Sequence, residues 1–202
     1  MKLLKHLTFA AAASTTVIAM GAAAPASAAV ILCQGANCVQ TDANVLVNSE
    51  TAPVITGNYN NSDVEVTFTS STESSLVANG NGQASVGALD GLLNQLTFTI
   101  ENGFGFTTAI FNLAAVPGNA VGEAVSVFIN YTNANGTSGS TQTSVNTNGQ
   151  NFFGISGTNG EVFTSAGFTG NPATTGIGQF QQLRPAAALL RLAPYPSQPL
   201  GL

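Results

Sequence analysis

The chain has 202 residues, with four Lys and Arg against nine Asp and Glu, and its formal net charge at pH 7 is −5. From Ala29 to Leu183 it contains no Lys, Arg or His. Because nucleic acids and anionic membrane surfaces are bound through cationic side chains, this composition excludes both as partners of that stretch. It also removes the histidine base of Ser-His-Asp and Cys-His catalysis and all lysine chemistry, so we expect no enzyme, no catalytic residue and no cofactor.

Residues 1–28 have the three parts of a bacterial secretory signal peptide. Lys2 and Lys5 make the start basic, the segment 7–24 is mildly apolar and rich in alanine, and an Ala-Ser-Ala cleavage sequence ends at Ala28. We predict cleavage after Ala28 and a secreted or cell-surface bacterial protein. Membrane contact is expected only through this peptide during export.

The two cysteines of the chain, Cys33 and Cys38, follow shortly after this peptide. In an oxidising compartment, a C-x4-C pair that spans a glycine-containing loop predicts a disulfide, worth about 2 kcal/mol for so small a ring. A zinc site would need two further ligands. The chain has no other Cys, and no His follows Ala28 to supply them.

Alternation of apolar and polar residues dominates the rest of the chain and predicts β-strands. In 63–70, for example, Val64, Val66 and Phe68 point to one side of the strand, and the residues between them point to the other. Within the strand-rich part of the chain, a single helical turn is expected at 87–94. Strands are predicted at 44–48, 52–58, 63–70, 75–78, 83–89, 94–101, 104–113, 124–132, 140–147, 151–157, 161–168 and 177–184.

Asn-Gly pairs punctuate these strands and predict tight type I′ turns, because both central positions of such turns need positive φ. The six pairs begin at Asn79, Asn81, Asn102, Asn135, Asn148 and Asn159. About ten short strands joined in this way predict an all-β fold for residues 29–184: a single antiparallel, jelly-roll-like β-sandwich.

Residues 185–202 are rich in Pro, Ala and Leu, and we expect a poorly ordered tail with a short helix at 186–192.

The segment 148–168 contains the most regular of the predicted hairpins. Asn159-Gly160 is expected to join its two strands in a tight turn. Ile155, Val162 and Phe168 are its candidate core residues. We also expect an ion pair between Glu161 and Arg184, the first cation after the long stretch without Lys, Arg or His.

Carboxylates and tyrosines supply the few candidate binding residues. Asp63 and Glu65 lie two residues apart on the solvent face of one strand, as in an ordinary soluble sheet edge, so we do not expect them to be the catalytic carboxylate pair of a glycosidase. Asp90 and Glu101 lie in loops and are the candidates for a structural calcium ion. Sugar stacking is assigned to Tyr59 and Tyr131, because most phenylalanines occupy core-facing positions. Phe104 and Phe106 are the phenylalanines expected to be least buried.

The sequence "GQNFFGISGTNGE", followed by "QFQQLR", resembles the closing strands of small exported bacterial proteins of the PEP-CTERM sorting class. The segments 57–72, 82–85 and 110–114 are similar to earlier strands of that group. The class's Pro-Glu-Pro anchor does not follow Arg184. The resemblance implies export, a role at the surface or in the matrix, and no known catalytic residues. The matching positions are Gly149, Gln150, Asn151, Phe152, Thr158, Asn159, Gly160, Glu161, Gln182 and Arg184.

Together these features predict a secreted, non-enzymatic β-sandwich protein of the bacterial cell envelope or extracellular matrix. The alternative function is a carbohydrate-binding module, which a structural calcium ion could stabilise. In both cases the expected partner is extracellular polysaccharide or matrix.

Overall fold

Strands β5 (Glu65–Thr69) and β9 (Gln95–Ile100) show how the sequence dictates the sheets. In both strands every second residue is apolar and buried, and a threonine lies on each side of the central phenylalanine. The antiparallel register sets Phe68 opposite Phe98, so the apolar residues of both strands lie on one face. The alternation predicted from the sequence is confirmed here.

The computed structural model contains strands and no helix in the part of the chain that it describes. The all-β prediction is therefore confirmed for these residues. The described residues are 30–41, 43–60, 62–80, 82–101, 103–116, 124–146, 150–158, 160–170, 176–185 and 190–191.

The strands form two large antiparallel sheets and one short ribbon. The seven-stranded sheet contains, in spatial order, β1 (Val30–Gln34), β14 (Gln150–Gly157), β11 (Thr108–Ala115), β16 (Ile177–Pro185), β8 (Ser85–Ala88), β6 (Leu76–Ala78) and β3 (Glu50–Ala52). The eight-stranded sheet contains β13 (Ser138–Asn146), β12 (Ala124–Asn133), β15 (Phe163–Gly170), β9, β5, β4 (Val54–Tyr59), β2 (Val45–Val47) and β7 (Gly82–Gln83). The ribbon pairs β10 (Phe104–Gly105) with β17 (Leu190–Arg191).

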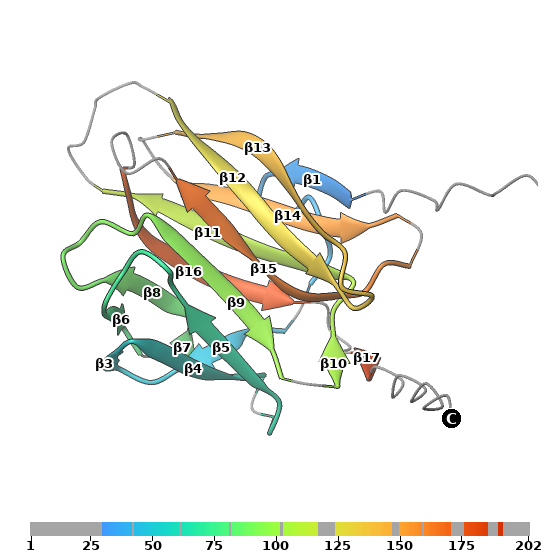
Figure 1. Cartoon of the computed structure of the whole chain (residues 1–202), viewed down its shortest axis with the longest axis horizontal. Coiled ribbons are helices and arrows are strands. Elements are labelled where there is room, and N and C mark those ends of the chain that lie inside the picture. The colour runs from blue at the N-terminus through green and yellow to red at the C-terminus, as the bar shows by residue number, and fades with distance from the viewer. Residues whose placement is uncertain are drawn as a thin grey trace, which may run out of the picture.

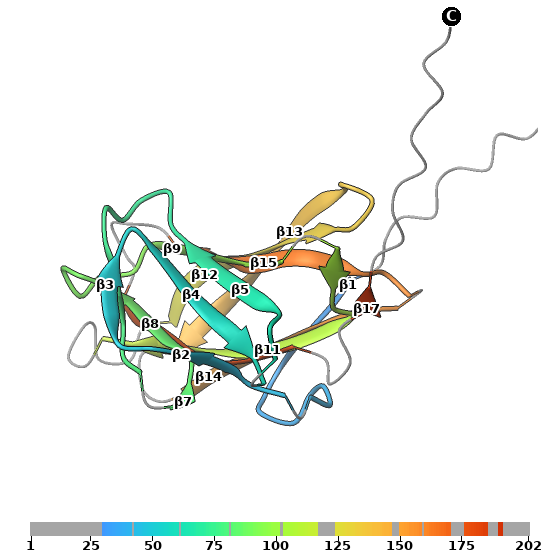
Figure 2. The same ribbon diagram turned by 90° about the horizontal axis from the view of Figure 1, so that it is seen from below.

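The two large sheets lie in two layers with their apolar faces toward each other (Figures 1 and 2), in a sandwich-like arrangement. One continuous cluster of buried side chains fills the space between them. Phe180 of β16 lies at its centre: its ring stacks on Phe111 at a centroid distance of 4.9 Å and also contacts Phe68, Phe98 and Phe168. Three of these four rings belong to the opposite sheet, so the phenylalanines join the two layers.

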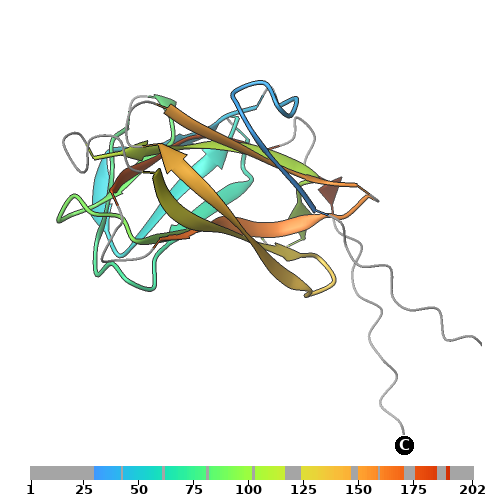
Figure 3. The same cartoon turned by 90° about the horizontal axis from the view of Figure 1, so that it is seen from above.

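Eight of the strands pair in a nested order, in which each pair encloses the next along the chain. β8 pairs with β16, β9 with β15, β11 with β14, and β12 with β13. Along the chain these strands alternate between the sheets, except at the β12–β13 hairpin, which forms one edge of the eight-stranded sheet (Figure 3). In these four pairs the first of the eight strands therefore pairs with the last, the second with the seventh, and so on to the β12–β13 hairpin.

The prediction of a tight hairpin at Asn159-Gly160 is wrong. β14 and β15, which flank it, belong to different sheets, so the segment between them crosses from one layer to the other. Of the three predicted core residues, Ile155 and Phe168 are buried, and Val162 is only half-buried.

The predicted ion pair between Glu161 and Arg184 is not among the contacts that Arg184 makes with the described residues. Arg184 donates instead from Nη2 to Oε1 of Gln182 at 3.1 Å. Gln182 has a φ of 55° at an irregularity in the pairing of β16 with β11, which lets one strand carry an extra residue.

The helical turn predicted within 87–94 is wrong, because a β-turn joins β8 to the loop before β9. The N–H of Gly91 donates to the carbonyl of Ala88 at 3.0 Å. The left-handed φ of 85° at Gly91 then reverses the chain without a helix.

The single strand predicted at 104–113 divides into β10 and β11. Phe106, between them, has no exposed surface, and Phe104 is half-buried. The expectation of low burial is therefore wrong for Phe106, whereas Phe104 is less buried than most of the described phenylalanines, although Phe128 is more exposed. The strand predicted at 83–89 divides in the same way, into β7 of one sheet and β8 of the other.

The Asn-Gly pair at Asn135-Gly136 joins β12 to β13 through a different turn from the one predicted. The N–H of Gly136 donates to the carbonyl of Asn133, and Gly136 has a φ of 83°, whereas Asn135 is not in the left-handed region. This is a type I turn followed by a left-handed glycine, another common hairpin connection. Three further Asn-Gly glycines take positive φ: Gly82, Gly103 and Gly160. Gly80 does not, and Asn148-Gly149 lies outside the described residues.

Strand β16 ends at Pro185, next to the predicted domain end at residue 184. Leu190–Arg191 pair with β10 as a strand, so the short helix predicted at 186–192 is wrong for these two residues. The other residues of the predicted tail, 186–189 and 192–202, lie outside the described residues, as do the signal peptide and its cleavage site at Ala28.

The predicted disulfide between Cys33 and Cys38 is present, with the two Cα atoms 5.8 Å apart. Cys33 belongs to β1 and lies opposite Gly154 of β14. A Cβ on Gly154 would lie 2.7 Å from Sγ of Cys38 and 2.8 Å from Sγ of Cys33, so only glycine leaves room for the disulfide here. The disulfide thus lies against the sheet and fixes the loop that follows β1.

Replacing both cysteines by serine (C33S/C38S) is expected to lower the free energy of unfolding by about 2 kcal/mol, because the six-residue ring no longer restricts the unfolded chain. Urea unfolding of the variant and of the parent chain measures this difference. Reductant should lower the free energy of unfolding of the parent chain by the same amount and should not change that of the variant. An unaltered unfolding midpoint in the variant would contradict the assignment.

Candidate functional site

The outer face of the eight-stranded sheet carries an unbroken row of hydroxyl side chains. The row crosses six strands because the cross-strand partners are all Ser or Thr at outward-facing positions. Each member is half-buried or exposed. Since neighbouring strands are about 4.8 Å apart, the row is about 24 Å long. Its members, in order, are Thr56, Thr67, Thr99, Ser165, Thr132 and Ser138.

A second polar row lies beside the first, two residues along each strand. Thr69 is opposite Thr97, and Asn130 is opposite Ser140. Gly167 lies between Thr97 and Asn130 and leaves the middle of this row without a side chain. The Thr-Phe-Thr sequences of β5 and β9 generate both rows, because each phenylalanine enters the core and its two threonines face outward.

Phe128 of β12 is exposed on the same outer face, with 46% of its surface accessible. Its cross-strand neighbours are Gln142 and Thr169, so the ring is surrounded by groups that form hydrogen bonds. Thr169 is already an acceptor for Nδ2 of Asn130 at 2.8 Å. An exposed aromatic ring among amides and hydroxyls can pack on the apolar face of a sugar while its neighbours bond the sugar's hydroxyls.

A shallow groove of about 360 Å³ lies across the two rows where β9, β15, β12 and β13 meet. Thr132 and Ser138, which line it, are bonded to each other through their hydroxyls at 3.0 Å. Thr56, Thr99 and Ser165 of the first row make no side-chain hydrogen bond to any described residue. Their hydroxyls can therefore serve a ligand as donors and acceptors.

Charge is confined to the edge of this face. Glu65 and Glu101 lie beside the first row at one end of β5 and β9, where Oε2 of Glu101 accepts the N–H of Glu65 at 3.2 Å. The two rows contain no charged residue. A ligand on the rows thus meets hydroxyls and amides, and an anionic ligand would find no cation to pair with.

The carboxylates proposed for calcium do not come together. Asp90 precedes β9 and Glu101 follows it, so the two are separated by the length of a six-residue strand, about 20 Å. Oδ1 of Asp90 accepts the N–H of Leu92, which closes its own loop. No group of three His, Cys, Asp or Glu that could hold a metal ion occurs among the described residues.

Neither tyrosine proposed for sugar stacking presents a free ring. Tyr59 is only 8% exposed. Tyr131 is half-buried, with its ring against Gly139 and its edge against Phe163. The residue that sequence reasoning missed is Phe128. Its position between Ser126 and Asn130, on the polar side of its strand, was the available signal.

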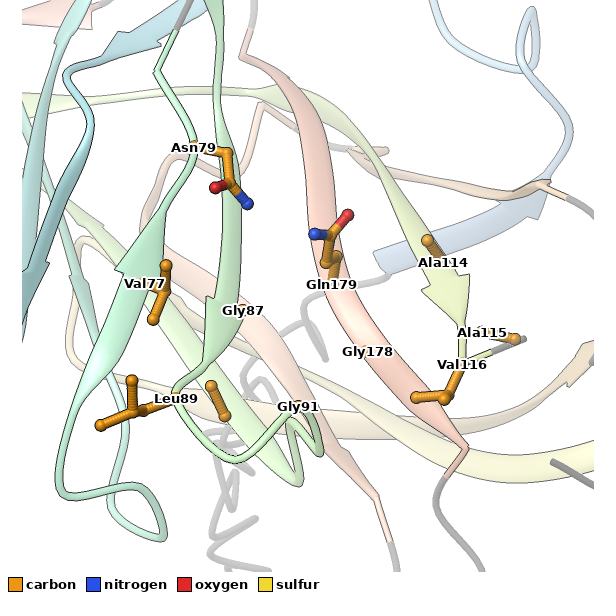
Figure 4. Close-up of a pocket in the computed structure, with 11 residues that line it drawn as sticks. Val77, Asn79, Gly87, Leu89, Gly91, Ala114, Ala115, Val116, Gly178 and Gln179 are labelled. Atoms are coloured by element: carbon orange, nitrogen blue, oxygen red, sulfur yellow. The ribbon is translucent and has the colours of Figure 1, made fainter. Parts of the chain in front are cut away.

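A second groove, of about 730 Å³, lies on the outer face of the seven-stranded sheet. Val77 and Leu89 lie on one side of it, and Ala115 and Val116 lie on the other, with Gly178 and its strand between them (Figure 4). Glycine and alanine line much of this groove, and it has no charged residue among its described lining residues. Nothing in it resembles a catalytic arrangement, since the lining supplies no nucleophile or base.

The described residues form an all-β fold of two antiparallel sheets, in which the two polar rows and the lining of the second groove contain no charged residue. Comparison with known proteins gives no match among family models, curated proteins or solved structures. In the described residues, no helix is long and apolar enough to span a membrane.

Proposed function

We propose that this chain is a secreted, non-enzymatic β-sandwich protein of the bacterial cell envelope or extracellular matrix. The observation that carries the proposal is the outer face of the eight-stranded sheet, an ordered polar surface that has no charged group in its two rows. Such a surface suits adhesion to uncharged polymers. The carboxylate that reaches it, Glu65, is exposed at its edge, where Oε1 accepts the hydroxyl of Thr67 at 3.5 Å, and the rows contain no histidine or lysine. The signal-peptide pattern of residues 1–28 supports export.

We also propose a jelly-roll topology. Its support is the nested pairing of β8 with β16, β9 with β15, β11 with β14, and β12 with β13, which is the order produced when one long hairpin wraps around two sheets. β3 to β6 repeat this on a smaller scale, with β4 paired to β5 and β3 to β6. Jelly rolls commonly serve as lectin and capsid domains, which bind or assemble without catalysis.

We retain the relation to the PEP-CTERM class as part of the proposal. Asn151, one of the matching positions, is 2% exposed and bonds the end of β13 to β14. Phe152 is half-buried in the same strand. If the chain shares a fold with the PEP-CTERM class, the matching residues should have structural roles. The contacts of Asn151 and Phe152 are of this kind, so they support the relation to the class and assign no activity.

The experiment that tests this function has two parts. The full chain is expressed in a bacterium with its own leader and should be recovered outside the cytoplasm. The purified protein is then incubated with neutral and acidic polysaccharides and with aryl esters, and no release of reducing ends or acid is expected. Turnover that scales with protein concentration would refute the non-enzymatic function.

A carbohydrate-binding module is the second candidate function. The exposed ring of Phe128 beside rows of hydroxyl and amide groups favours it, because sugar sites combine one apolar contact with several hydrogen bonds. The calcium ion expected with this function receives no support from the positions of Asp90 and Glu101.

A further inference from the structure

We propose that the two polar rows and Phe128 form a binding site for a neutral polysaccharide chain, which lies across the strands of the eight-stranded sheet. This inference rests on the proposed carbohydrate-binding function and names the residues and the ligand class. The residues concerned come from β4, β5, β9, β15, β12 and β13. None of these strands needs to move, because the register already sets their side chains in line.

The chemistry of the rows selects a neutral, hydroxyl-rich ligand. Hydroxyls such as those of Thr99 and Ser165 both donate and accept hydrogen bonds, as do the hydroxyls of a sugar. A row hydroxyl and a sugar hydroxyl can therefore form a hydrogen bond with either one as the donor. Glu65 and Glu101 border the first row and would repel uronic acid or sulfate groups. From Ala29 to Leu183 the chain has no cation to offset that repulsion.

The direction of the chain follows from the shape of the surface. The groove between Thr97 and Ser138 crosses β9, β15, β12 and β13, so a polymer in it runs across the strands. Phe128 lies beside this path on β12, one row beyond Asn130. We therefore assign Phe128 to the apolar face of one sugar ring, and the hydroxyl rows to the sugars before and after it.

An ordered ice surface is the other ligand that regularly spaced threonines could fit. Adjacent strands of a sheet are rotated by about 20–25°, so six strands turn the row by about 100° in total. A flat lattice would contact only the few threonines of two neighbouring strands, whereas a flexible polymer can follow the twist. The length of the row therefore favours a polysaccharide.

The test uses the full chain in native gels that contain a soluble mixed-linkage β-glucan, a galactomannan or alginate. Retardation is expected with at least one neutral glycan and not with alginate. The variant T99V/T132V removes two hydroxyls and keeps the β-branched shape, and it should bind about tenfold more weakly or worse. F128A should weaken binding to a similar extent. The control T51V/T108V changes two threonines of the seven-stranded sheet and should bind like the parent chain.

Each other outcome overturns the inference in a distinguishable way. Absence of retardation with every neutral glycan rejects the site but leaves an exported, non-enzymatic protein standing. Equal loss in T51V/T108V means that the rows are not the site. Inhibition of ice recrystallisation, or self-association in sedimentation, that T99V/T132V abolishes without any glycan binding assigns the face to ice or to a second copy. Release of reducing ends from the glycan would refute the proposed function itself. Thermal unfolding of each variant confirms that it is folded.

Discussion

Replacing Phe180 by alanine is expected to lower the free energy of unfolding by about 3–5 kcal/mol, because the substitution removes the central ring of the core. Phe180 is fully buried, stacks on Phe111 and contacts three phenylalanines of the opposite sheet. Its removal leaves a cavity between the layers, and rings held by two sheets cannot close it without moving strands. Urea unfolding followed by circular dichroism gives the difference.

The control for this prediction is F128A, which removes the same side chain from the solvent face of β12. Phe128 is 46% exposed, so its loss should change stability by no more than about 0.5–1 kcal/mol. Equal destabilisation by F180A and F128A would contradict this prediction, because in the structure Phe180 contacts the core and Phe128 does not.

Replacing Asn151 by alanine is expected to lower the free energy of unfolding by about 2–3 kcal/mol. Its Oδ1 accepts the N–H of Asn146 at 2.8 Å, and its Nδ2 donates to the carbonyls of Asn146 and Leu113 at 2.8 and 3.1 Å. Asn146 ends β13 in one sheet, and Leu113 belongs to β11 in the other. The side chain thus ties the two sheets together, and alanine leaves buried groups unpaired.

The control for Asn151 is N58A in β4, where the side chain is exposed. It should leave the unfolding midpoint within experimental error of the parent. Hydrogen exchange provides a second measurement, because N151A should speed exchange at Asn146 and its neighbours more than elsewhere. An N151A variant as stable as N58A would argue against the role given to this network.

The strand positions could be predicted from the sequence because sheet burial has a period of two residues. Phe68 and Phe98 alternate with threonines, and this pattern alone decides which side chains enter the core. The connections are harder to predict. Asn159-Gly160 has the local signature of a hairpin, yet β14 and β15 belong to different sheets, because pairing depends on contacts distant in sequence.

The candidate site is only partly visible in the sequence. Residue type favours Tyr59 because a tyrosine combines a ring with a polar group, but the structure buries it, whereas Phe128 is exposed on a polar face. Single strands show pairs such as Thr67 and Thr69, which look like ordinary solvent-facing residues. Only the register aligns them with Ser165 and Thr132 from strands far along the chain.

Residue type and local spacing are enough to establish the all-β class, the disulfide between Cys33 and Cys38, and the lack of cations from Ala29 to Leu183, so these features can be read without any structure. Which strands are neighbours depends instead on the three-dimensional fold. Pairing across two sheets is set by the packing of one shared core around Phe180, which no local pattern encodes. That packing, by fixing the register, also assembles separate serines and threonines into the rows of the eight-stranded sheet.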